Sequence, residues 1–280
     1  MEKLVNKSFT GERALYGIKD KIIENSVFED GESPLKEVEN IKINKCSFKW
    51  KYPLWYAKKI EVNDCNFEIM SRSGIWYSED LIFKNCKSVT PKSFRRCKRL
   101  KIFDSEFKDC TESMWECEYI EIKNSQFSGD YLLKNAQNVV IDGLTLDGNY
   151  LLDGGKHIIV RNSILNSRDA FWNCDDVLVE NCIINSEYIA WNTKNIKFVN
   201  CQIDSIQPFC YTQNLKLVDC KMFHANLSFE RSTVKGNILN RIESIKNPYE
   251  LQLKCKGYDE LIVEEDISNK DNIHIEVEEE

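Results

Sequence analysis

The stretch AFWNCDDVLVENCIINSEYIAWNTKNIKFVNC, residues 170–201, contains nearly the same pattern twice. The tetrapeptide FWNC at 171–174 is matched by AWNT at 190–193. Each is followed by two apolar residues at alternate positions, an Asn-Cys pair and one further apolar residue. The period is nineteen residues. Because an internal repeat of this length is typical of a solenoid, the repeat indicates the fold before any single element is assigned.

The pattern recurs along most of the chain at spacings of nineteen to twenty-one residues. Aligned on the residue that follows the Asn or Asp, its eleven copies fall at Ser26, Cys46, Cys65, Cys86, Ser105, Ser125, Leu144, Ser163, Cys182, Cys201 and Cys220. A repeat over about residues 11–240 indicates one elongated domain. We therefore expect a β-helix over residues 1–240 and a C-terminal β cap, continuous with the same domain, over residues 241–280.

Each copy predicts three short strands separated by turns. Two apolar residues at alternate positions, such as Val177 and Val179, indicate a strand with one buried face. The Asn or Asp that follows tolerates a left-handed conformation and predicts a sharp corner. A small residue and then an apolar one predict the second strand, and an apolar residue such as Phe171 marks the third.

Three strands in about nineteen residues describe an all-β protein, a right-handed single-stranded parallel β-helix of about eleven coils. The C-terminal strands are expected to cap one end of the stack, because an exposed parallel edge promotes aggregation. Residues before Gly11 are expected to cap the other end.

The composition is that of an ordinary globular protein. A net charge of −7 argues against general binding to nucleic-acid phosphates. The chain opens without an apolar signal segment and has no run of eighteen apolar residues, so we expect a cytoplasmic protein with no membrane partner. Twelve cysteines without a C-x-x-C pair indicate reduced, buried thiols. No cofactor is expected, and the oligomeric state is left open.

The residue after the buried apolar of each third strand is expected to face solvent, because side chains alternate along a strand. Five of the six tryptophans fall in this column, which also includes Cys210 and Phe229. Together with the residue that follows each, it predicts an aromatic strip that binds a ligand. The predicted ligand-binding residues are Trp55, Tyr56, Trp76, Tyr77, Arg95, Arg96, Trp115, Lys134, Trp172, Asn173, Trp191, Asn192 and Tyr211.

Aromatic rings interleaved with Arg, Lys and Asn suit a saccharide-like ligand, whose C–H faces stack and whose hydroxyls need donors and acceptors. We expect Arg95 to stack between Trp76 and Trp115 and one continuous groove to run from Arg95 to Asn192. In an alternative interpretation, the tryptophans cover one another or lie under the preceding turn. That turn supplies Tyr52, Tyr131, Tyr150 and Tyr188. The alternative function is a structural or protein-interaction scaffold that uses the same strip.

Enzymatic activity is left open. The candidate catalytic carboxylates are Asp153 and Asp169, because a glycosidase needs two carboxyl groups roughly 5 to 9.5 Å apart. A surface ion pair between Asp153 and Lys134 is the alternative. Asp175 and Asp176 fall in a turn and are interpreted as solvated charge, so no metal site is predicted.

Several stretches resemble the DUF3737 family of unknown function, within the pectin-lyase-like right-handed β-helix superfamily. They cover about residues 8–250 and include GESPLKEVENI, FKWKYPLWY, SGIWY, PKSFRRC, IDGLTLDGNY, DAFWNC, EYIAWNTKN and SFERSTV. The resemblance implies the fold and brings no catalytic residue. The wider superfamily includes pectate lyases and polygalacturonases, but this chain lacks the Gly-His-Gly and Arg-Ile-Lys motifs and the clustered Asp set of those enzymes.

Overall fold

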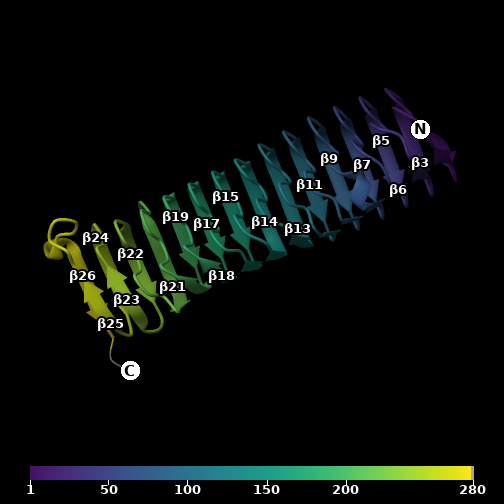
Figure 1. Ribbon diagram of the computed structural model, residues 1–280. Coiled ribbons are helices and arrows are strands. Elements are labelled where there is room, and N and C mark those ends of the chain that lie inside the picture. The colour runs from purple at the N-terminus through teal and green to yellow at the C-terminus, as the bar shows by residue number, and fades with distance from the viewer. Residues whose placement is uncertain (279–280) are drawn as a thin grey trace. The chain divides into compact units, whose positions relative to one another are not determined.

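The computed structural model describes residues 1–278, which are almost entirely β-strands and turns (Figure 1). The chain divides into two compact units. Unit 1 comprises Met1–Thr145 and unit 2 begins at Leu146. Within each unit the chain winds as a right-handed parallel β-helix, returning to the same strand position once per coil. The predicted all-β fold class is confirmed.

In unit 1 the long strand of each coil pairs in parallel with the long strand of the next. These long strands are β1 (Glu2–Val5), β3 (Lys19–Glu24), β5 (Glu39–Asn44), β7 (Lys58–Asn63), β9 (Glu79–Lys84), β11 (Lys98–Phe103), β13 (Glu118–Ser128) and β14 (Gln137–Asp147). The short second strands are β2 (Ser8–Phe9), β4 (Val27–Phe28), β6 (Ser47–Phe48), β8 (Asn66–Phe67), β10 (Lys87–Ser88) and β12 (Glu106–Phe107). A short 3-10 helix, η1 (Ile69–Ser71), follows β8.

Unit 2 repeats the arrangement. Its long strands are β15 (Lys156–Arg161), β17 (Asp175–Glu180), β19 (Lys194–Val199), β21 (Leu215–Phe223), β22 (Thr233–Ile238), β24 (Glu250–Cys255) and β26 (Ile273–Val277). The second strands are β16 (Ile164–Asn166), β18 (Ile183–Glu187), β20 (Gln202–Ile206), β23 (Ile242–Lys246) and β25 (Tyr258–Ile262). A 3-10 helix, η2 (Lys270–Asn272), precedes β26.

The long strands number eight in unit 1 and seven in unit 2, so the described residues form about fifteen coils, not the predicted eleven. One missed coil contains β1, which pairs with β3 in the segment expected to cap the N-terminal end. The other three contain β22, β24 and β26, which continue the parallel ladder. Their corners lack the Asn-small pair, and this is why the repeat did not reveal them.

The predicted left-handed corners are confirmed. Asn181 has φ 55° and Asn200 φ 50°, and even the exceptional corner residues Lys45 and Gly143 have φ 52° and 75°. The reversed peptide plane at each corner turns the chain from the long strand into the second strand.

The small residue after each corner is buried, and in several coils its side chain also accepts a hydrogen bond from the backbone of the coil before. The backbone N–H of Cys86 donates to Ser105 Oγ at 3.0 Å, and that of Cys46 donates to Cys65 Sγ at 3.3 Å. Ser and Cys exchange along this column because both offer an acceptor to the coil before. All twelve cysteines are buried and free, as predicted for all of them except Cys210, which was assigned to the outward column.

The predicted third strand is not a strand. In the coil of Leu54, Leu54 and Tyr56 have φ 58° and 56°, so alternate residues are left-handed. The Leu54 N–H donates to Pro34 O in the coil before, at 3.0 Å, whereas the Tyr56 N–H donates to Trp76 O in the coil after, at 2.9 Å. This turn segment orders its side chains in, out, out, in. Leu54 and Ala57 are buried, while Trp55 and Tyr56 lie outside.

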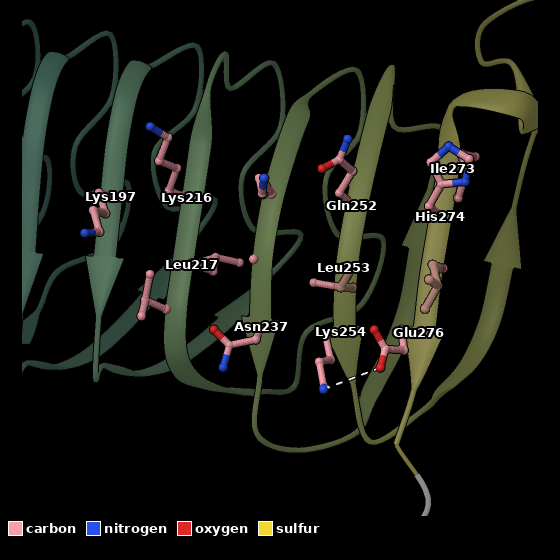
Figure 2. Close-up of a pocket in the computed structure, with 14 residues that line it drawn as sticks. Lys197, Lys216, Leu217, Asn237, Gln252, Leu253, Lys254, Ile273, His274 and Glu276 are labelled. Carbon is pink, nitrogen blue, oxygen red and sulfur yellow. Dashed lines mark ion pairs between the residues drawn. The ribbon is translucent and has the colours of Figure 1, made fainter.

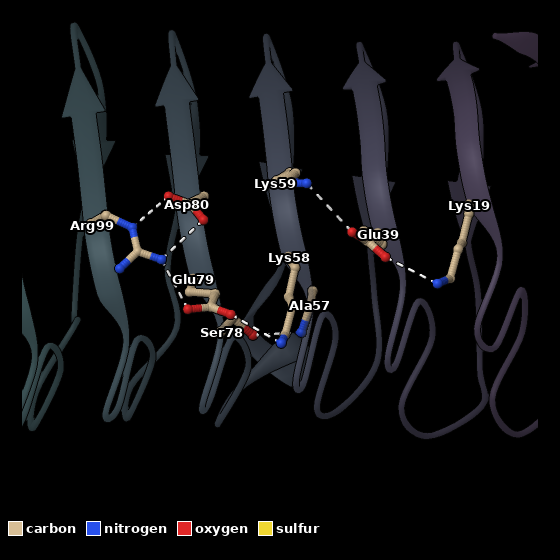
Figure 3. Close-up of polar contacts among 9 residues, drawn as sticks. All are labelled: Lys19, Glu39, Ala57, Lys58, Lys59, Ser78, Glu79, Asp80 and Arg99. Carbon is tan, nitrogen blue, oxygen red and sulfur yellow. Dashed lines mark hydrogen bonds and ion pairs between the residues drawn. The ribbon is translucent and has the colours of Figure 1, made fainter.

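Ion pairs between successive coils cover the outer face of unit 1 where the long strands begin (Figure 3). Lys19 pairs with Glu39 at 3.0 Å, and Arg99 Nη2 donates to Asp80 Oδ2 at 3.0 Å. Inside, phenylalanine rings stack from coil to coil, with the Phe28 and Phe48 centroids 4.6 Å apart. The backbone repeat thus stacks phenylalanine on phenylalanine inside and places opposite charges next to each other outside.

Candidate functional site

The predicted aromatic strip is present on the outer side of the turn segments, and each unit carries one part of it. The N-terminal strip consists of Trp55, Trp76, Arg95, Trp115 and Lys134 in unit 1. The C-terminal strip consists of Trp172, Trp191 and Tyr211 in unit 2. The groove predicted from Arg95 to Asn192 includes residues of both units, and it stays a prediction.

The tryptophans of both strips are half-buried, and the indoles of Trp55, Trp76, Trp115 and Trp172 are anchored to the turn of the next coil. Trp76 Nε1 donates to Lys92 O at 2.7 Å, and Trp172 Nε1 donates to Tyr188 O at 2.7 Å. The alternative interpretation, in which the rings lie against a turn, is therefore correct for one edge of these four rings. The other edge faces outward.

In the N-terminal strip, neighbouring side chains of the column stack on one another. The Trp55 and Trp76 centroids lie 5.0 Å apart with planes inclined by 7°. The Arg95 guanidinium lies 5.2 Å from the Trp76 ring and 4.3 Å from the Trp115 ring, which confirms the predicted cation–π stack. The Lys134 ammonium also lies near the Trp115 ring, 5.8 Å from its centroid. Successive faces are thus covered by the next residue in the column.

The second outward column of unit 1 is more exposed but is also stacked. Tyr56 and Tyr77 are 44 % and 37 % exposed, and their rings lie 5.0 Å apart at 8°. Arg96 lies 5.7 Å from the Tyr77 ring and donates to Glu116 Oε2 at 2.8 Å. The ring stacking, cation–π contact and ion pair of this column are therefore made among its own residues.

The C-terminal strip is splayed. The Trp172 and Trp191 planes diverge by 34° with centroids 6.0 Å apart, and Trp191 and Tyr211 diverge by 46° at 4.9 Å. Tyr150 meets Trp172 edge-on at 5.9 Å, and Arg231 lies 5.9 Å from the Tyr211 ring. Tyr188 meets Trp191 edge-on at 6.2 Å. The rings of this strip are therefore in tilted and edge contact and do not form the parallel stack seen in unit 1.

A polar row runs beside the C-terminal strip. Asn173 Nδ2 donates to Asp153 Oδ1 at 2.8 Å, and Asn192 Nδ2 donates to Asn173 Oδ1 at 2.9 Å. Each amide has a second N–H and further acceptor capacity, so the row combines donors and acceptors along three coils. The structure therefore places an amide row next to open aromatic rings.

The two candidate carboxylates lie in different environments. Asp153 belongs to the polar row, whereas Asp169 is only 4 % exposed and its Oδ1 has no hydrogen-bond partner. Burial raises the pKa of Asp169 above its usual range, and a hydrogen bond from Tyr150 opposes that shift. A catalytic role for this pair stays a prediction.

Two residues assigned to the outward column are buried instead. Phe229 stacks under Phe209 at 5.9 Å, so it belongs to the inward column and Glu230 and Arg231 are the outward residues of that coil. Cys210 is fully buried because its small side chain lies under the strip, and burial raises its thiol pKa to about 12. A thiol in this state is a poor nucleophile.

The described residues contain no group of three or more His, Cys, Asp or Glu placed to hold a metal ion. Asp175 and Asp176 were predicted in a turn but are the first two residues of β17. Asp176 is exposed and pairs with His157 at 2.8 Å. In the same part of the chain, no helix is long and apolar enough to cross a membrane.

One feature of unit 2 was not predicted. A groove of about 1060 Å³ lies on the outer face of the long strands from β19 to β26 (Figure 2). Its lining includes Lys197, Lys216 and Lys235, one from each of three successive long strands. The sequence carries a signal for this column, because in each of the three strands a lysine follows the first buried apolar residue: Ile196, Leu215 and Val234.

A family model described as "Protein of unknown function (DUF3737)" matches residues 2–276. The chain belongs to the DUF3737 family. A search of curated protein sequences finds no match to this DUF3737 chain.

Solved structures similar to the DUF3737 chain are remote. PfbA, a surface adhesin of Streptococcus pneumoniae, shares 12 % identity with a TM-score of 0.41, covering 79 % of this chain and 69 % of PfbA. The tailspike protein of E. coli bacteriophage HK620, in complex with a pentasaccharide, shares 10 % identity with a TM-score of 0.38, covering 86 % of this chain and 61 % of the tailspike. The A-module of the Azotobacter vinelandii mannuronan C-5 epimerase AlgE4 shares 7 % identity with a TM-score of 0.33, covering 99 % and 88 %. No function is transferred from likenesses this distant.

Proposed function

We propose that unit 2 binds a saccharide along the C-terminal strip. The observation that carries this proposal is the set of diverging rings of Trp172, Trp191 and Tyr211 next to the polar row, whereas Trp55 and Trp76 of unit 1 stack in parallel. A sugar presents C–H faces to such rings and hydroxyls to their surroundings.

The polar row supplies the hydroxyl partners. Asn173 and Asn192 retain one amide N–H each, and Asp153 adds a carboxylate to the same row. Because the row repeats at roughly 4.8 Å per coil, a ligand lying along it meets a new polar group at every coil.

The proposed function is binding rather than glycoside hydrolysis. A glycosidase uses two carboxyl groups that both reach the scissile bond. Asp169 is 4 % exposed and its hydrogen bond with Tyr150 holds it under the strip. We retain a cytoplasmic location in this proposal, supported by twelve buried reduced thiols.

The test is tryptophan-fluorescence titration with a panel of neutral oligosaccharides. We expect Trp172→Ala to weaken binding at least about tenfold, since it removes a stacking platform. The matched control is Trp76→Ala in the closed strip, which should change affinity less than about twofold. If both variants bind as the parent protein does, or if no sugar in the panel binds, the proposal fails.

A second variant separates binding from folding. Asn192 is exposed, so Asn192→Leu should keep the thermal midpoint while losing the amide that a hydroxyl needs. Sugar affinity that is unchanged in Asn192→Leu would contradict the role of the polar row.

A further inference from the structure

The groove on the long strands of unit 2 lies on a different face of the coil from the C-terminal strip. Lys197, Lys216 and Lys235 occupy the central outward positions of β19, β21 and β22. The register of β21 against β22 shifts between Leu217 and Cys220, and an irregularity of this kind bends a strand. The groove lies over the strands on either side of this irregularity.

The three lysines stack directly on one another. Lys197 is the register partner of Lys216, and Lys216 is the partner of Lys235. Gln252 and His274 continue the same column on β24 and β26, where Figure 2 shows them along the groove. In the described part of the chain none of the three lysines forms an ion pair. Like charges directly opposite each other in a sheet are destabilising, so this column costs stability as it stands.

The same column in unit 1 is arranged differently. Lys42 is the register partner of Glu61 and pairs with it at 3.3 Å, and Lys101 is the partner of Glu121 and pairs with it at 3.1 Å. The chain carries a net charge of −7, so carboxylates are plentiful. A run of three unneutralised lysines at consecutive coils is therefore a departure from the protein's own pattern, and its natural complement is an anion that comes from outside.

We propose that this groove binds an acidic saccharide whose carboxylates pair with Lys197, Lys216 and Lys235. Amide groups of Asn237 and Gln252 line the same groove and suit the sugar hydroxyls. The inference is independent of the C-terminal strip, because it rests on charge in the long strands and not on rings in the turn segments.

Spacing favours a saccharide over an acidic peptide. The lysine column repeats at roughly 4.8 Å, whereas side chains on one face of an extended peptide repeat at roughly 6.8 Å and fall out of step with it. A saccharide with one carboxylate on each ring carries one charge per sugar residue. It can therefore offer one anionic group to each lysine of the column. Nucleic acid is disfavoured because the net charge of −7 repels a dense polyanion.

The test uses tetragalacturonate as the acidic probe and cellotetraose as the neutral one, with the full chain in isothermal titration calorimetry at low salt. We expect tetragalacturonate to bind more tightly than cellotetraose. The triple variant Lys197→Gln, Lys216→Gln, Lys235→Gln should weaken tetragalacturonate binding at least about tenfold. Added salt should weaken binding to the parent protein, since the contacts are ionic and exposed.

Matched controls exclude general charge effects and unfolding. Lys42→Gln with Lys101→Gln removes lysines from the same column of unit 1 and should leave affinity unchanged. The triple variant should melt no lower than the parent, because it removes repulsion. Trp172→Ala should still bind tetragalacturonate in the groove, which separates this site from the C-terminal strip.

Three outcomes would overturn the proposal. The first is equal affinity for tetragalacturonate and cellotetraose in Trp172→Ala, where binding of the neutral sugar at the C-terminal strip is weakened. The second is a triple variant that binds tetragalacturonate as the parent does. The third is tighter binding of oligoglutamate or of a single-stranded oligonucleotide than of tetragalacturonate, which would assign the groove to another class of ligand.

Discussion

Units 1 and 2 are built on the same coil but present different outer faces. In unit 1 Trp55 and Trp76 stack at 7°, and Lys42 pairs with Glu61 across neighbouring strands. In unit 2 Trp172 and Trp191 diverge by 34°, and Lys197 lies beside Lys216. Where each side chain of a column stacks on or pairs with the next one, the column stabilises the fold. Where neighbours do not satisfy each other, the face is available to a ligand.

The corner columns do not share this contrast, because neighbouring corner residues bond to each other in both units. In unit 2 the corner amides bond to each other, with Asn200 Nδ2 donating to Asn181 Oδ1 at 2.8 Å. In unit 1 Asn124 Nδ2 donates to the Asp104 carboxylate at 3.4 Å. Amide ladders of this kind are neutral, so salt affects them less than it affects ion pairs.

The largest expected effect concerns the closed strip. Trp76→Ala removes the stack on Trp55, the contact with Arg95 and the hydrogen bond to Lys92, so it should lower the free energy of unfolding by about 2–4 kcal/mol. Trp172→Ala should cost roughly half as much, because among the residues that the structure describes it removes a tilted ring contact and an edge contact but no parallel stack and no cation–π contact. Urea unfolding of both variants measures the difference. Equal losses would show that ring divergence does not distinguish the two strips.

A smaller effect is expected at the buried carboxyl of unit 2. The pKa of Asp169 is raised in the folded state, so the native protein binds this proton more tightly than the unfolded chain does. Stability from this group is highest below the unfolded pKa, near 4, and is lost as pH rises through the folded pKa. Asp169→Asn should therefore raise the free energy of unfolding at pH 7 by about 1 kcal/mol and change it little at pH 3.

Denaturant unfolding at the two pH values checks this prediction. The control is Asp30→Asn, which alters an exposed carboxylate in unit 1 and should have no comparable effect at pH 7. If Asp169→Asn destabilises the protein at pH 7, then the carboxylate is satisfied in the native state and the assignment of a strained, buried acid is wrong.

The smallest effects have opposite signs in the two units. Lys42→Gln removes a partner of Glu61 and should lower stability by about 0.2–1 kcal/mol. Lys216→Gln relieves repulsion from Lys197 and Lys235 and should raise stability by a few tenths of a kcal/mol. Both differences should shrink in 1 M salt. Stability changes of the same sign in Lys42→Gln and Lys216→Gln would contradict the proposed difference in charge pairing between the two units.

The sequence by itself determined the coil. A residue such as Asn181 tolerates the left-handed corner, and the alternation of Val177 and Val179 places both side chains inside, so these local properties predicted the corners, the long strands and the stacked columns. The position of the tryptophans outside the turn segment, and the stack of Arg95 between Trp76 and Trp115, also followed from the repeat.

Only the tertiary structure decided how each column behaves. The left-handed residues of the third segment, the tilt of Trp172 against Trp191 and the groove over the lysine column all depend on contacts between residues about nineteen positions apart. The end coils were missed for a related reason, since β26 is held in the ladder by pairing with β24 and its own sequence lacks the corner signature. A repeat specifies which residues are stacked, but the fit between neighbouring side chains determines whether a stack is closed or open to a ligand.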